Sequence, residues 1–345
     1  MRNRRVRIKL ISIFFAAIAV GIFTTIVVFV IKTKKTILPE NSIDTKENLF
    51  SRVRFKTYNR QGKEINIKSD SVHENKKDNY LFRNMVSNFA LSNGERLKIS
   101  SNVIYATREY KRQCEFLGNV RLSTDSGFIM KTEQLFVDFD KKIARGNTSV
   151  EITQDNTRVS AKKCFFDMNK NTLTLIGNVN GFIKLDKINS DTLVIHFDNI
   201  YGKNIQNIDA LGNATYTTKD YLLKARKSIT YSPNEIRAQE NVILVYKKSG
   251  NRYDVRSNSM RAQINNGLLD HVEANNSLTI KTNNAIIRAD RGILKDDKIK
   301  VSGNVAISGK QGNVLGRSAT LDMKTGDVFI LESSGVVDDG THKND

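Results

Sequence analysis

The chain has 345 residues, an apolar fraction of 39% and a formal charge of +19, so it can bury a sizeable core in one large or two ordinary domains. Such a charge suggests a polyanionic partner. Residues 1–60 alone carry thirteen Lys and Arg against three acids, however, so about half of the excess surrounds the first apolar run. This distribution argues against nucleic acid as the partner.

Patterns of catalytic and metal-ligating residues are missing from the sequence. Cys114 and Cys164 lie 50 positions apart, neither belongs to a CxxC pair, and the four histidines are isolated from one another. The HExxH, GxSxG and glycine-rich phosphate-binding motifs do not occur. We therefore expect no enzyme activity, no metal ion and no cofactor.

The first predicted element is a transmembrane helix over residues 10–31. At about 1.5 Å per residue these 22 positions span the hydrocarbon layer of about 30 Å. A cleaved signal peptide is the alternative, because residues 1–9 are basic, but the run is long and lacks a small-x-small cleavage site. Five basic residues precede the run and three follow it, which predicts a single-pass membrane protein with a cytoplasmic N-terminus and a periplasmic bulk.

One face of this helix carries the small residues Ala17, Gly21 and Thr25, four positions apart. Such a stripe permits close approach of a partner membrane helix. Small residues are also common in membrane helices without any such role, and this alternative stays open.

From about residue 48 onward, apolar and polar residues alternate in short runs, which is typical of β-strands. A repeat of about thirty residues recurs, and several of its centres read Gly-Asn-Val. A glycine in mid-strand marks a bulge or kink where a sheet curves. We expect an all-β fold, a stacked antiparallel sheet or jelly-roll, with repeat centres at 116–122, 145–152, 175–182, 211–216, 239–246, 275–280 and 301–307.

Both cysteines fall on the apolar parity of their predicted strands. Buried free thiols are therefore the first expectation. A disulfide between Cys114 and Cys164 is the alternative in an oxidising periplasm.

Residues 127–179 resemble the LptC family, the membrane-anchored periplasmic component of the lipopolysaccharide-transport bridge. The opening GKEINIKSD (62–70) and the strand pair at 99–122 follow in the family's order, so the resemblance covers residues 1–185. Residues 186–345 resemble the LptA/OstA repeat through 190–199, 208–216 and 289–307, whereas an ordinary LptC ends near residue 185. The expected parts are a basic N-terminus (1–9), the transmembrane helix (10–31), a linker (32–50), an LptC-like jelly-roll (51–185), an LptA/OstA-like region (186–337) and a polar tail (338–345).

This resemblance implies a twisted, open β-jelly-roll trough that holds lipid acyl chains and leaves the sugars in water. The implied partners are lipopolysaccharide or a related glycolipid, the inner-membrane ABC transporter subunits that supply energy, and an LptA-like periplasmic protein. A closed β-sandwich would show the same alternation, so a membrane-tethered structural or adhesive scaffold is the rival function. The candidate lining residues are Phe116, Leu122, Phe128, Met130, Leu135, Val137, Phe139, Leu173, Leu175, Leu193, Ile195 and Phe197.

The pleat predicts that crosslinkers at Phe139 or Leu175 capture lipid, whereas crosslinkers at the opposite-parity positions Asp138 and Thr174 do not.

The last predicted strand carries Val328, Phe329, Ile330 and Leu331, which place apolar side chains on both faces. Charge, proline or a bulge normally protects such an edge, and this run has none of them. We expect a partner β-strand to add here, with proline at Phe329 weakening the joining. Cover by the chain's own domain is the alternative.

Overall fold

The structure is a computed structural model. It describes residues 48–58, 64–75, 79–90, 96–107, 113–125, 127–138, 140–167, 169–183, 186–197, 205–248, 250–265, 268–309 and 312–337. Within these ranges, no helix has the length and apolarity that crossing a membrane requires. The predicted helix 10–31 with Ala17, Gly21 and Thr25, and the polar tail, lie outside the described residues.

The described part of the chain is all-β, as the alternation predicted, and it contains no helix. The strand pairings given for it are all antiparallel. Its strands are β1 (Asn48–Tyr58), β2 (Glu64–Asn75), β3 (Asn79–Ala90), β4 (Arg96–Thr107), β5 (Gln113–Thr124), β6 (Ile129–Asp138), β7 (Ile143–Gly146), β8 (Val150–Gln154), β9 (Thr157–Ala161), β10 (Lys163–Asp167), β11 (Thr172–Ile183), β12 (Asp186–Phe197), β13 (Ile205–Leu211), β14 (Ala214–Thr217), β15 (Tyr221–Ala225), β16 (Ser228–Ser232), β17 (Glu235–Lys248), β18 (Asn251–Asn265), β19 (Leu268–Lys281), β20 (Ala285–Lys295), β21 (Lys298–Gly309), β22 (Gly312–Asp322) and β23 (Val328–Val337).

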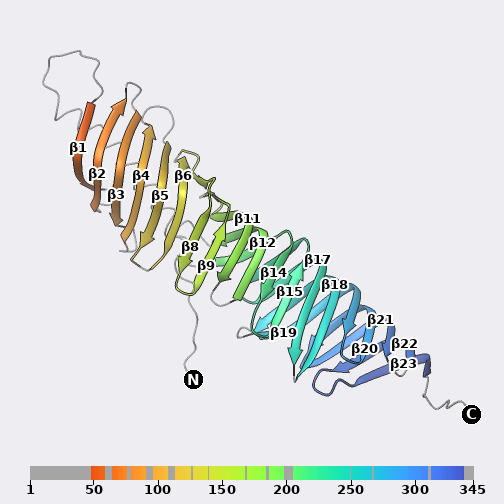
Figure 1. The fold of residues 1–345 in the computed structure, drawn as a ribbon. Coiled ribbons are helices and arrows are strands. Elements are labelled where there is room, and N and C mark those ends of the chain that lie inside the picture. Colours follow the sequence, from red (N-terminus) through yellow and green to blue (C-terminus); the bar gives the residue numbers. More distant parts are fainter. Residues whose placement is uncertain are drawn as a thin grey trace, which may run out of the picture. The chain divides into compact units, whose positions relative to one another are not determined.

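The chain divides into two compact units. Unit 1 comprises residues up to 184 together with 194–206, and unit 2 comprises 185–193 together with 207–345, so the division runs through β12. In unit 1, β1 to β6 lie side by side as long strands in chain order (Figure 1). In unit 2, β17 to β23 follow one another in the same manner.

Unit 1 is built from two half-sheets that share the long strands. β6 shows the split, because its residues 129–132 pair with β8 while residues 136–138 pair with β7. β11 divides in the same way between β10 and β9. We name the part that contains β7 and β10 half-sheet A and the part that contains β8 and β9 half-sheet B. Half-sheet A holds residues 48–51, 71–75, 79–83, 103–107, 113–117, 134–138 and 172–176, and half-sheet B holds 53–58, 64–69, 85–90, 96–101, 120–124, 129–132 and 179–183.

The core of unit 1 lies between these half-sheets. Phe116 on half-sheet A and Leu122 on half-sheet B are both 0% exposed, although they belong to one strand, β5. A single sheet leaves both of its faces open, so complete burial in both halves requires that each half covers the other. Each long strand therefore crosses the corner of the unit and contributes to both walls of one core.

The predicted mid-strand bulges are present, and they explain the Gly-Asn repeat. Six of the centres place two consecutive residues at positive φ, where glycine and asparagine are tolerated best. The hydrogen-bonded register shifts at these points, for example between Leu117 and Val120. The centre at 145–152 has no such pair, and there the chain breaks into β7 and β8; at 211–216 the pair lies in the break between β13 and β14. The six pairs are Gly118 with Asn119, Gly177 with Asn178, Gly212 with Asn213, Glu240 with Asn241, Asn276 with Ser277, and Gly303 with Asn304.

Two of these bulges are held by an amide-to-carboxylate hydrogen bond to a neighbouring strand. The side-chain amide of Asn213 donates to Asp191 at 3.0 Å, and that of Asn304 donates to Asp290 at 2.9 Å. The bulge residues thus bridge strands at points where the backbone ladder is interrupted.

Both cysteines are free and buried, as their parity predicted. Burial raises the pKa of the Cys114 thiol to about 12 and that of the Cys164 thiol to about 11. Because the thiolate is the reactive form, we expect neither thiol to react with Ellman's reagent in the folded protein and both to react in guanidinium chloride. Rapid reaction of either thiol in native buffer would contradict this burial.

Candidate functional site

Ten of the predicted lining residues are buried. Nine of them lie on the buried faces of strands, and one directly precedes a strand. Each of them is at most 3% exposed. Their inward orientation is therefore confirmed, while contact with lipid stays a prediction. Phe139 and the side chain of Phe197 lie outside the described residues. The ten are Phe116 and Leu122 on β5, Phe128 just before β6, Met130, Leu135 and Val137 on β6, Leu173 and Leu175 on β11, and Leu193 and Ile195 on β12.

Asp138 departs from the predicted alternation. It is 3% exposed although its neighbour Val137 is also buried. Its carboxylate accepts the side-chain amide of Gln113 at 2.8 Å and the backbone N–H of Lys141 at 2.9 Å. The parity breaks because β6 ends here and the carboxylate binds the turn that follows, so Asp138 is not an outward-facing control, whereas Thr174 is partly exposed.

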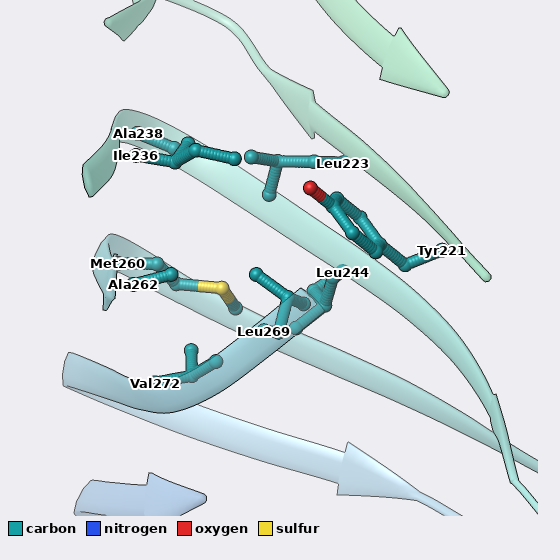
Figure 2. A pocket seen from close by; sticks show the side chains of 9 residues that line it. All are labelled: Tyr221, Leu223, Ile236, Ala238, Leu244, Met260, Ala262, Leu269 and Val272. Carbon is teal, nitrogen blue, oxygen red and sulfur yellow. The ribbon is translucent and has the colours of Figure 1, made fainter. Parts of the chain in front are cut away.

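The interior of unit 2 contains two small cavities that side chains leave unfilled. Figure 2 shows apolar side chains from four strands converging on a cavity, with the ring of Tyr221 at one side. The space left between them is about 10 Å³, which is room for about one water molecule. The lining residues are Tyr221 and Leu223 on β15, Ile236, Ala238 and Leu244 on β17, Met260 and Ala262 on β18, and Leu269 and Val272 on β19.

A second apolar cavity of about 20 Å³ adjoins the first. Leu244 and Val272 line both, so the two spaces have these side chains in common. The second cavity extends through β18 to β21 and reaches Met323 beyond β22. The interior of unit 2 is thus a continuous apolar layer, and a long alkyl chain can enter it only if side chains from facing strands move apart.

Phenol groups supply the polar atoms near this layer. The hydroxyl of Tyr216 donates to the Asp186 carboxylate at 2.6 Å, and its ring lies 6.1 Å from that of Tyr221, which lines the first cavity. Burial raises the pKa of both Tyr216 and Tyr221, so both are neutral at neutral pH. In the second cavity the Tyr253 hydroxyl donates to the backbone carbonyl of Met323 at 2.8 Å. The layer therefore presents neutral groups to whatever enters it.

β23 presents an edge. Within the described residues it pairs with β22 alone. Its apolar residues alternate between the two faces, as predicted, and those on the outer face are exposed: Phe329 by 63% and Leu331 by 65%. Apolar side chains of this size at a sheet edge favour addition of another strand.

The turn before β23 determines which backbone groups meet this edge. The N–H of Asp322 donates to the carbonyl oxygen of Asp327 at 2.9 Å. Bonded and non-bonded pairs alternate along an antiparallel ladder, so two positions further on Phe329 again forms a bonded pair, with Thr320 on β22. The backbone groups of Phe329 therefore face β22, and those of Ile330 face the open edge.

A protein-family comparison agrees with these features. Residues 16–184 match the model of the family described as lipopolysaccharide-assembly, LptC-related. Comparison with curated proteins gives no match. The match ends at residue 184, whereas the β-structure continues to Val337 in unit 2. Residues 16–184 thus match the LptC-related family, and an all-β region of the same long-strand design follows them in the chain.

Proposed function

We propose that the chain is an inner-membrane-anchored bridge segment of lipopolysaccharide transport, which holds acyl chains in its apolar interior and passes them on without chemical change. The family match over residues 16–184 supports the transport role. In this proposal residues 10–31 anchor the chain, ABC transporter subunits supply the energy, and an LptA-like protein receives the lipid.

The observation that carries the lipid-binding part is the continuous apolar layer in unit 2. Burying an acyl chain contributes about 0.8 kcal/mol for each methylene group. Opening the layer costs a comparable free energy for each unit of apolar area that it separates. The reason is that buried side chains such as Leu244 and Ile280 lose contacts with the facing strands. The free energy gained by burying the acyl chain and the free energy lost by opening the layer are therefore of similar size. This balance suits a protein that must both accept a lipid and release it.

Leu244 and Ile243 provide a test within one strand. Leu244 lines both cavities, whereas Ile243 lies on the outer face of β17 opposite Arg256. A photo-crosslinking amino acid at position 244 is expected to capture lipopolysaccharide in cells at least about tenfold more often than one at position 243, because successive side chains point to opposite faces. Mass spectrometry of the crosslinked protein measures the captured lipid.

Leu175 and Thr174 give the corresponding pair in unit 1. Equal capture at both members of both pairs would contradict an interior lipid site. The rival scaffold function predicts capture at none of the four positions. It also predicts that protein purified in mild detergent contains no lipopolysaccharide.

A further inference from the structure

The central cross-strand row on the outer face of half-sheet A carries mainly apolar and aromatic side chains. Its two charged residues are engaged locally. Glu115 accepts the side-chain amide of Gln134 at 2.6 Å, and the guanidinium of Arg145 lies 4.5 Å from the ring centroid of Phe136. The row runs across the strands through Leu49, His73, Leu81, Tyr105, Glu115, Phe136, Arg145 and Phe165.

The outer face of half-sheet B differs, because it holds a row of cations. Arg54 on β1 stands directly opposite Lys68 on β2, and Arg121 on β5 stands directly opposite Lys131 on β6. The registers of β3 and β4 join these two pairs into one row, and Lys98 lies beside it on β4. All five side chains are exposed. Like charges directly opposite one another destabilise a sheet by a few tenths of a kcal/mol to about 1 kcal/mol.

The described carboxylates nearest this row have other partners. Glu151, opposite Lys131 on its other side, forms an ion pair with Arg158 at 2.7 Å. Glu133 accepts the backbone N–H of Asn119 at 3.1 Å. Among the residues that the structure describes, none of the five cations has a carboxylate within ion-pair distance.

Unit 2 shows how the same chain neutralises a comparable pair. Arg237 and Arg261 also stand directly opposite one another, on β17 and β18. Both form ion pairs with Glu235, and the Arg237 contact is 2.7 Å long. Among the described residues the pairs in half-sheet B form no such ion pair, so they stay available to an anion from outside the chain.

We propose that the outer face of half-sheet B binds an anionic lipid membrane surface. From β1 to β6 the cations extend over about 24 Å, at about 4.8 Å between strands, on the outer face of the sheet. Each cation near an anionic bilayer contributes about 1 kcal/mol. Single-stranded nucleic acid fits less well, because bases stack on aromatic side chains and this row has Val86 and Ser100 between its cation pairs. The proposal does not depend on whether the interior carries lipid.

Two labelling sites on β4 test the proposal. Lys98 lies on the outer face of half-sheet B and Tyr105 on that of half-sheet A. Because both native thiols are buried, a Lys98→Cys or Tyr105→Cys variant of the full chain takes one fluorophore. Each labelled chain is combined by detergent removal with phosphatidylcholine vesicles, with or without phosphatidylglycerol, that contain a headgroup quencher. Quenching is expected at position 98 in the anionic vesicles alone. It should disappear at about 0.5 M salt, where the Debye length is about 4 Å.

A charge reversal completes the test. Arg121→Glu with Lys131→Glu should abolish most of the quenching, whereas Arg256→Glu with Arg288→Glu, the same charge change at exposed positions of unit 2, should leave it unchanged. The proposal is wrong if quenching does not depend on lipid charge, or if position 105 is quenched as strongly as position 98. It is also wrong if the fluorescence at position 98 responds only to added lipopolysaccharide, RNA or an acidic protein and not to anionic vesicles. Circular dichroism checks the fold of each variant, and the lipid and salt arms decide even if a reversal variant does not fold.

Discussion

Proline at position 330 is expected to lower the affinity of the chain for a strand-donating partner at least about a hundredfold. The backbone N–H of Ile330 faces the open edge of β23, and proline removes this donor and places its ring where the added strand would lie, at a cost of about 3 kcal/mol. Ile330→Ala is the matched control, because it shortens the same side chain and keeps the N–H. Titration with a purified LptA-like jelly-roll protein of the same cell envelope measures the difference.

Proline at Phe329, which the sequence alone suggested, should act differently. The N–H of Phe329 faces β22, so this substitution breaks the chain's own hairpin instead of its free edge. We expect Phe329→Pro to lower the stability of unit 2, as seen in thermal unfolding, and Ile330→Pro to leave it nearly unchanged. If Ile330→Pro binds the partner as tightly as Ile330→Ala does, β23 is not the docking strand.

Alanine at position 181 is expected to destabilise unit 1 by about 3 kcal/mol, the upper end of the usual cost of overpacking, because the atoms that it would meet are backbone atoms. Gly181 lies on β11 opposite Val159 on β9. An added Cβ would overlap the carbonyl oxygen of Arg158 and lie 2.7 Å from the Cα of Val159. Both are backbone atoms, so β9 itself would have to move.

Gly316→Ala is the comparison for this substitution. An added Cβ there would approach the Cγ2 methyl of Ile330 at 2.9 Å, and a side-chain methyl can turn away. We expect its cost to stay below about 1 kcal/mol. Urea unfolding of both variants and the wild type gives the two free-energy differences. Equal losses would mean that the close approach of β9 and β11 is not a rigid constraint.

Features that depend on one strand at a time could be predicted from the sequence. The pleat alone turns Phe116 and Leu122 inward, and the Gly118–Asn119 pair is a bulge because few other residues adopt positive φ at low cost. The buried state of Cys114 follows from the same parity. The alternation of apolar and polar residues therefore predicted both the fold class and the orientation of the predicted lining residues.

Features that depend on several strands could not be predicted in this way. The space beside Leu244 depends on how side chains from four strands fill one volume, and the burial of Asp138 depends on the turn after β6. The pairing of Arg54 with Lys68 requires the register of two strands. The sequence showed a surplus of cations, but it could not show which of them share a face.

The way in which long strands run through both half-sheets makes the body extensible. Two successive long strands of unit 1 contain parts of both half-sheets and of the corner between them. The cross-section of the core is therefore the same for any number of strands. Adding or removing one hairpin would change the length by about 10 Å and leave the cross-section as it was. Such a design lets a gap of a given width be matched by the number of repeats, while every neighbour along the stack meets the same interface.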